Sequence, residues 1–102
     1  GCFVAAGAVV GPGAVLGEGA IINSNAVVDH DCVIGAFAHV APGAALSGAV
    51  TVGEASLVGT GAAIIQGVHV GAGVLIGAGA AVVADVADGT TVTGVPARQR
   101  KP

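Results

Sequence analysis

Aliphatic residues recur at every sixth position of this chain, from Val4 to Val82. The fifth position of each six-residue repeat, or hexad, holds a small residue, and the third and fourth positions are rich in glycine, proline and polar residues. The pattern runs without insertion over residues 4–87 and gives fourteen hexads, and an internal repeat of this regularity determines the fold. The first positions are Val4, Val10, Leu16, Ile22, Val28, Ile34, Val40, Leu46, Val52, Val58, Ile64, Val70, Ile76 and Val82. The fifth positions are Ala8, Ala14, Ala20, Ala26, Cys32, Ala38, Ala44, Val50, Ser56, Ala62, Val68, Val74, Ala80 and Val86.

Each hexad fits a short strand followed by a tight bend. Side chains alternate along a strand, so the fifth position of one hexad and the first position of the next both point into the interior. The sixth position lies between them and points outward, while the third and fourth positions turn the corner. Stacked units of this kind predict an all-β fold, a parallel β-solenoid with a thin aliphatic interior.

Glycines at the second position indicate how many hexads make one coil. Gly17, Gly35, Gly53 and Gly71 are 18 residues apart, and Gly89 continues the series. This spacing favours three hexads per coil, which gives a triangular prism. Fourteen hexads then form between four and five coils, with neighbouring coils roughly 4.8 Å apart.

The composition agrees with a narrow interior. Of the 102 residues, 54% are hydrophobic and 19 are glycine, but only two are aromatic. High hydrophobicity with 9% charged residues excludes intrinsic disorder. The uncharged stretch between Glu54 and Asp85 has the hydropathy of a membrane helix, yet its seven glycines and its six-residue period argue against one. No membrane partner is therefore expected.

The few cations are confined to the C-terminus. Arg98, Arg100 and Lys101 are the only arginines and lysines of the sequence, and the net charge is −3. No basic face exists to neutralise a phosphate backbone, so nucleic acid is not an expected partner. We expect residues 1–87 to form the solenoid and residues 88–102 to form a C-terminal loop with a basic tail.

Candidate chemistry begins at His30, which occupies a third position and therefore a corner. Asp29 and Asp31 flank it, and a carboxylate beside an imidazole orients the ring and stabilises its cation, which suits a general base. The alternative is a solvated histidine in a polar turn. Gly48 follows 18 residues later, so it should lie one coil away, leave space beside the ring and expose an N–H to an oxyanion. The alternative is an ordinary corner glycine.

His39 occupies an outward sixth position in a largely apolar column. The column also holds Ile21, Leu57, Leu75 and Thr93. A contiguous apolar strip on the outside of a protein typically marks an interface, so we expect this face to pack against another subunit. His39 is then either an interface histidine or a contact in a site between subunits.

Cys32 lies two residues from His30, which makes it a candidate nucleophile. It occupies an inward fifth position, however, and this favours a packed small residue. A reaction at this corner is therefore expected to proceed without a covalent intermediate on Cys32.

The hexads, of the type [LIV]-G-x-x-A-x, resemble those of the hexapeptide-repeat acyltransferases, which form left-handed parallel β-helices. The left hand is implied by this resemblance alone, because general crossover rules favour the right hand. The segment IINSNAVVDHDCVIGAFAHVAPGAALSG, residues 21–48, resembles one branch of the family, and so do IGAGAAVV and GVPAR further on. That branch holds the nucleotide-sugar N-acetyltransferases of bacillosamine and perosamine synthesis and the related sialic-acid acetyltransferases.

The resemblance implies transfer of an acetyl group from acetyl-CoA to the amino group of a nucleotide-linked sugar. It implies that His30 is the general base, Asp31 its carboxylate partner, and Gly48 the backbone amide that binds the thioester oxygen. Asn23 matches a position that lines the acceptor site, and His39 matches one that contacts the acetyl donor.

The resemblance also implies a coenzyme A path, a homotrimer with sites between subunits, and a cytoplasmic location. The pantetheine arm would run along Thr60, Gly77 and Ala78. The only cationic segment of the chain would face the phosphates of the coenzyme. The loop that holds the nucleotide end corresponds to Gly94, Val95, Pro96, Ala97 and Arg98.

A zinc site is the alternative raised by three histidines, because γ-class carbonic anhydrases share this type of solenoid. His30, His39 and His69 fall in three different columns, and their spacing does not resemble the paired ligands of that family. We therefore expect no metal, and we interpret His69 as a surface or interface residue.

Three further expectations remain open. Acetylation of a hydroxyl, as in the sialic-acid enzymes, is an alternative to acetylation of an amine. A non-catalytic solenoid, such as an ice-binding one, is the other alternative. An ice-binding solenoid needs a flat ladder of repeated outward threonines, and the threonines of this chain form no such ladder. Members of the branch usually carry an N-terminal Rossmann-like domain that is absent here, so we expect an isolated C-terminal domain or a reduced homologue. The threonines are Thr51, Thr60, Thr90, Thr91 and Thr93.

Overall fold

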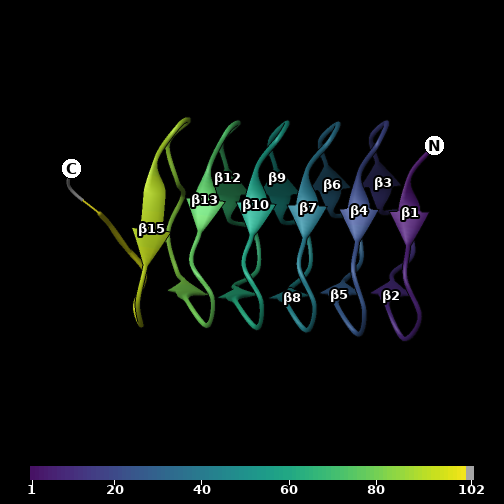
Figure 1. Ribbon diagram of the computed structural model, residues 1–102, viewed down its shortest axis with the longest axis horizontal. Coiled ribbons are helices and arrows are strands. Elements are labelled where there is room, and N and C mark those ends of the chain that lie inside the picture. The colour runs from purple at the N-terminus through teal and green to yellow at the C-terminus, as the bar shows by residue number, and fades with distance from the viewer. Residues whose placement is uncertain (101–102) are drawn as a thin grey trace.

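The computed structural model describes residues 1–100 and forms a β-solenoid of stacked coils (Figure 1). Almost every strand is two residues long and consists of a sixth position followed by a first position. The strands are β1 (Phe3–Val4), β2 (Val9–Val10), β3 (Val15–Leu16), β4 (Ile21–Ile22), β5 (Val27–Val28), β6 (Val33–Ile34), β7 (His39–Val40), β8 (Ala45–Leu46), β9 (Thr51–Val52), β10 (Leu57–Val58), β11 (Ala63–Ile64), β12 (His69–Val70), β13 (Leu75–Ile76), β14 (Ala81–Val82), β15 (Thr91–Thr93) and β16 (Arg98–Gln99).

Up to β14, strands that are three apart in the chain pair in parallel, which produces the three faces of a prism. The seven-stranded sheet has the order β1-β4-β7-β10-β13-β15-β16, the five-stranded sheet β14-β11-β8-β5-β2, and the four-stranded sheet β12-β9-β6-β3. In Figure 1 the parallel strands β1, β4, β7, β10, β13 and β15 point downward on the near side, while successive coils advance from right to left. This sense of rotation is left-handed, so the predicted left-handed parallel β-helix is confirmed.

The first and fifth positions fill the interior, as the hexad pattern predicts. From Ala20 onward, every fifth-position residue and every first-position aliphatic up to Val82 is buried. The first coil differs because none of residues 1–100 covers its outer end: Val4 is 44% exposed and Val10 37% exposed, although both occupy first positions. The core therefore holds the coils of residues 20–82 most firmly.

The corners depend on a left-handed backbone conformation at the fourth position. Glycine adopts it without a steric penalty, but Asn25, Asp31, Phe37, Ala49 and Ala55 adopt it too, with φ of 58–59°. Asparagine and aspartate tolerate this region better than other residues with a side chain. Asp31 is therefore held in a restricted conformation by the same corner that carries His30.

The last coil departs from the 18-residue spacing. Val70 lies opposite Val86 and Ile76 pairs with Val92, so this coil is two residues shorter. Val86 consequently occupies the place of a first position rather than the predicted fifth, and Gly89 lies at a fourth position, with φ of 69°, rather than the predicted second. The shortened bend between β14 and Val86 accounts for both differences.

The outward column through His39 ends differently for the same reason. Leu75 pairs with Thr91, not with the predicted Thr93. Residues 88–100, expected to be a loop and tail, contain β15, which extends the seven-stranded sheet, and β16, which pairs with β15 in the antiparallel direction. No element within residues 1–100 is a helix with the length and hydrophobicity needed to span a membrane.

Candidate active site

His30 lies at the corner between β5 and β6, where the five-stranded sheet meets the four-stranded sheet. Its Nδ1 lies 3.1 Å from Asp31 Oδ2, and its side chain is 49% exposed. A carboxylate can only accept hydrogen bonds, so Nδ1 carries the hydrogen and Nε2 keeps its lone pair. The Asp29 carboxylate accepts the backbone N–H of His30 at 2.7 Å. Asp29 therefore holds the corner while Asp31 orients the ring.

Gly48 lies directly against the His30 ring from the next coil. A Cβ at Gly48 would come within 2.5 Å of Cε1 and 3.0 Å of Cδ2, and closer still to Nε2. Ala49 donates its N–H to the His30 carbonyl at 2.9 Å, which ties the two corners together. Within residues 1–100 no oxygen accepts a hydrogen bond from the Gly48 N–H. Gly48 thus leaves the space beside the imidazole that the 18-residue column predicts, and it carries an unused donor.

Asn23 and His39 form a second polar group at a different corner. Asn23 follows β4 and reaches across to the next coil, where its Nδ2 lies 3.1 Å from Nε2 of His39 in β7. The Asn23 Oδ1 accepts the backbone N–H of Ser24 at 2.7 Å. Both side chains are half-buried. This pairing joins residues sixteen positions apart, so the 18-residue columns did not reveal it.

Thr60, Gly77 and Ala78 follow the same corner as Asn23, on later coils. Thr60 and Ala78 are exposed, and Gly77 is half-buried. The coils approach closely here, because a Cβ at Gly59 would come within 2.7 Å of the Ala78 backbone nitrogen. This corner therefore carries short side chains on closely stacked coils.

The predicted site residues consequently fall on two edges of the prism. We call the corner with His30, Asp31 and Gly48 the His30 edge, and the corner with Asn23 and its later neighbours the Asn23 edge. The five-stranded sheet, with strands such as β5 and β8, separates the two edges. One copy of the chain does not bring both groups together.

The C-terminal segment packs back onto the last coil. Ala81 donates its N–H to the Gly94 carbonyl at 3.0 Å, and Ala97 donates to the Ala81 carbonyl at 2.7 Å. Arg98 and Arg100 are exposed, and no carboxylate of residues 1–100 forms an ion pair with either. Lys101, the third cation of the basic tail, lies outside the described residues. The end of the solenoid therefore carries two exposed arginines that form no ion pair within residues 1–100.

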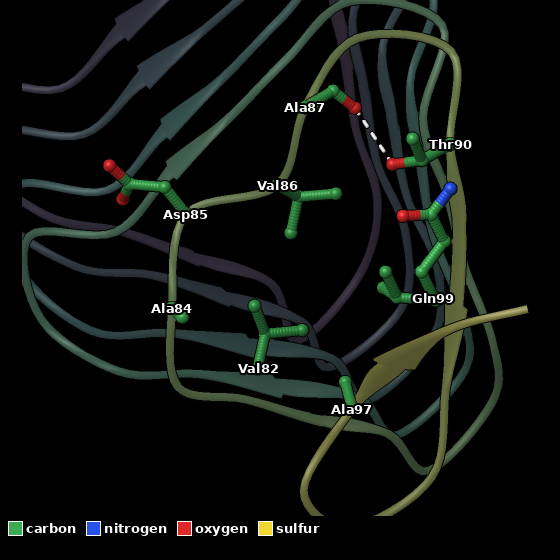
Figure 2. Close-up of a pocket in the computed structure, with 9 residues that line it drawn as sticks. Val82, Ala84, Asp85, Val86, Ala87, Thr90, Ala97 and Gln99 are labelled. Carbon is green, nitrogen blue, oxygen red and sulfur yellow. Dashed lines mark hydrogen bonds between the residues drawn. The ribbon is translucent and has the colours of Figure 1, made fainter.

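A cavity of about 240 Å³ opens at the C-terminal end of the prism (Figure 2). Figure 2 shows Val82 and Val86 pointing into this space, with Thr90 and Gln99 on the opposite side. Ala97 also lines it. The cavity continues the hydrophobic interior beyond the shortened last coil, and His30, Asp31 and Gly48 do not line it. We therefore attribute it to the open end of the core.

The three histidines remain in separate places. His69 donates its backbone N–H to the Asp85 carboxylate at 2.8 Å, and its side chain is exposed on β12. Within residues 1–100, no group of three His, Cys, Asp or Glu side chains has an arrangement that could hold a metal ion.

Cys32 is a packed interior residue, as its fifth position predicts. Its side chain is fully buried, and its thiol donates to the Ser47 carbonyl at 3.2 Å. Burial raises the pKa of the Cys32 thiol, because a thiolate is poorly solvated inside the prism. A raised pKa keeps the sulfur protonated and unreactive at neutral pH.

This environment predicts selective alkylation of the two cysteines. In the folded chain, iodoacetamide should modify the exposed Cys2 and leave Cys32 unmodified until the protein is denatured, as peptide mass spectrometry would show. Equal labelling of both thiols in the native state would contradict this interpretation of Cys32.

Solved structures provide the comparison with known proteins. The acetyltransferase domain of PglB from Neisseria gonorrhoeae FA1090, in complex with acetyl coenzyme A, is 48% identical over 97% of this chain, with a TM-score of 0.93. A histidine-to-alanine mutant of GDP-perosamine N-acetyltransferase from Caulobacter crescentus, in complex with CoA and GDP-perosamine, is 40% identical over 99% of this chain, with a TM-score of 0.95. This chain belongs to the hexapeptide-repeat acetyltransferases.

More distant members of the family share the fold. Neisseria gonorrhoeae serine acetyltransferase is 30% identical over 93% of this chain and has a TM-score of 0.86, with 40% of its own length covered. The chain spans 51% of the PglB domain structure and 51% of the perosamine enzyme. No family model and no curated protein sequence matches the chain.

Proposed function

We propose that this chain transfers the acetyl group of acetyl-CoA to the amino group of a nucleotide-linked sugar. The observation that carries the proposal is the His30–Asp31 pair with its ring against Gly48, whose N–H is unused, in a chain 48% identical to an acetyltransferase domain in complex with acetyl-CoA. The 40% identity to a GDP-perosamine N-acetyltransferase favours an amine on a nucleotide sugar over a hydroxyl. Use of acetyl-CoA is consistent with a cytoplasmic enzyme.

The reaction proceeds by direct attack of the amine on the thioester carbonyl. His30 Nε2 accepts a proton from the attacking nitrogen, and Asp31 stabilises the resulting imidazolium. The Gly48 N–H donates to the oxyanion that develops on the carbonyl oxygen. The C–S bond then breaks, and the thiolate of coenzyme A leaves and takes up a proton. Because Cys32 is buried, no acyl-enzyme is required.

Coenzyme A lies along the Asn23 edge in this proposal. The pantetheine arm follows the row of Thr60, Gly77 and Ala78, whose short side chains lie at an accessible corner. The loop Gly94–Arg98 holds the nucleotide end, and the exposed guanidinium of Arg98 is suited to a phosphate.

The test of the proposed function is binding followed by transfer. Calorimetry should detect binding of acetyl-CoA, and mass spectrometry should detect a gain of one acetyl group on amino-sugar nucleotides in a panel that also holds hydroxyl acceptors. Absence of acetyl-CoA binding would contradict the enzyme assignment and favour a structural solenoid. Acetylation of hydroxyl acceptors alone would overturn the assignment to amines.

We further propose that the active unit is a homotrimer. A site that uses both edges is completed when the His30 edge of one copy faces the Asn23 edge of another. Three copies around an axis form three such sites and leave neither edge unused. The apolar outward column of Ile21, Leu57 and Leu75 is a suitable surface for packing at this interface.

Mixing two inactive variants tests the shared site. His30→Ala disables one edge, and Ala78→Asp places a carboxylate in the proposed pantetheine track at an exposed corner that tolerates polar residues. In random co-assembly of equal amounts, half of the subunits carry an intact His30 edge and the other half carry an intact Asn23 edge. About one quarter of the sites should then combine two intact edges and be active. A mixture no more active than the mean of the two variants would place the whole site within one subunit.

A further inference from the structure

The two histidines of the proposed site contact partners of opposite hydrogen-bonding character. The Nδ1 of His30 faces the Asp31 carboxylate, an acceptor, at 3.1 Å. The Nε2 of His39 faces the Asn23 side-chain amide at 3.1 Å. Which ring nitrogen of a histidine carries the hydrogen is set by the partner of the other nitrogen. The partners therefore decide what each exposed nitrogen can do.

The orientation of the Asn23 amide is set by its own neighbour. Its Oδ1 accepts the backbone N–H of Ser24 at 2.7 Å, so its Nδ2 must face His39. The reversed amide would set an NH2 group against the Ser24 N–H, which is two donors in contact. Because Nδ2 can only donate, Nε2 of His39 must accept, and Nδ1 carries the hydrogen.

The backbone around this pair leaves little freedom. Asn23 donates its N–H to the Val40 carbonyl at 2.9 Å, and His39 donates its N–H to the Ser56 carbonyl at 2.9 Å. Ile21 and Leu57 flank His39 in register on the neighbouring strands. Within residues 1–100 no carboxylate pairs with the His39 ring, so Asn23 is the polar side chain that determines its state.

We propose that Asn23 is a positioning residue that fixes His39 as the Nδ1–H tautomer, so that its free Nδ1–H donates a hydrogen bond to the acetyl donor. The second half of this proposal rests on the proposed function. Both rings then hold their hydrogen on Nδ1, yet they expose opposite nitrogens. His30 offers a lone pair that takes a proton, and His39 offers an N–H that binds an oxygen.

Nuclear magnetic resonance of the full chain with 15N-labelled histidine tests the tautomer without any ligand. Two-bond 1H–15N correlations at mildly alkaline pH should show hydrogen on Nδ1 of His39 in the wild type. Asn23→Asp keeps the shape and the acceptor for Ser24 but replaces the donor with an oxygen, so His39 should switch to the Nε2–H form. Asn25→Asp is the matched control, because it adds the same charge two residues away without facing the ring.

The kinetic arm tests the donor role. Asn23→Asp should raise KM for acetyl-CoA about tenfold, as expected for one lost hydrogen bond, with the His30 resonances unchanged. Asn25→Asp should leave both the tautomer and KM at wild-type values. An Nε2–H ring in the wild type, or an unchanged tautomer in Asn23→Asp, would overturn the positioning role of Asn23.

The two halves of the proposal fail separately. A switched tautomer with unchanged KM would overturn the hydrogen bond to the acetyl donor and keep the positioning role. An Nδ1–H ring in a wild-type chain that does not bind acetyl-CoA would contradict the proposed function and still support the effect of Asn23 on His39.

Discussion

Replacing His30 with alanine is expected to lower kcat for acetyl transfer by about 10²–10⁴-fold, the range typical of a lost general base. The amine would still reach the thioester, but no group would remain at this corner to take its proton. Binding of acetyl-CoA should change little, because the proposed coenzyme path follows the other edge of the prism. Steady-state kinetics with an amino-sugar nucleotide, together with calorimetry of acetyl-CoA binding, measures the two effects separately.

His69→Ala provides the matched control for His30→Ala. His69 is also an exposed histidine on the solenoid, but the Asp85 carboxylate contacts its backbone N–H and not its ring. The control variant should therefore keep wild-type kcat. Undiminished turnover in a folded His30→Ala trimer would remove the imidazole from the mechanism and, with it, the role proposed for Asp31.

The hexad pattern was sufficient to predict the interior, the corners and the length of a coil. Each hexad repeats the same local choice of an aliphatic, a bend and a small residue, so fourteen copies reinforce one geometry. The contact between His30 and Gly48 follows from the same spacing, because the two residues occupy one column. The left hand did not follow from the pattern, since an inward/outward alternation is the same in either hand.

The last coil could not be predicted, because the hexad pattern of the sequence continues to Val86 while the coil itself is two residues shorter. The Asp85 carboxylate accepts the His69 N–H, where earlier coils use a backbone carbonyl, and the bend closes two residues early. Val86 therefore moves from one inward position to another while remaining buried. A hydrophobic pattern does not predict that a side chain will accept a hydrogen bond in place of a backbone carbonyl.

The polar contacts of the candidate site were only partly visible in the sequence. Asn23 and Asp29 both stand at a second position, and both accept the N–H of the next residue, which fixes the following corner. An Asn or Asp immediately before a bend is a signal for this contact. The hydrogen bond from Asn23 to His39 joins two different 18-residue columns, so the repeat could not predict this contact.

Gly48→Ala is expected to lower kcat by about 10²-fold while the fold persists, since displacement of a catalytic group by about 1 Å has an effect of this size. The added methyl group would come within 2.5 Å of the His30 ring. The ring is half exposed, so it can swing outward without disturbing the core. That movement would take Nε2 away from the Gly48 N–H, and the base and the oxyanion donor would no longer face one reacting carbon.

Gly67→Ala separates this effect from a general loss of stability. Gly67 lies one coil further along the same edge, with φ of +77° and no atom within 4 Å of an added Cβ. Ala49 and Ala55 show that alanine is accepted at such corners, so the substitution should cost about 1 kcal/mol of stability and leave kcat unchanged. Thermal unfolding should therefore show a loss of stability for Gly67→Ala without a loss of kcat. Gly48→Ala should instead show a large loss of kcat in a chain that still folds. Wild-type kcat in Gly48→Ala would mean that the contact between His30 and the Gly48 amide is not part of the reaction.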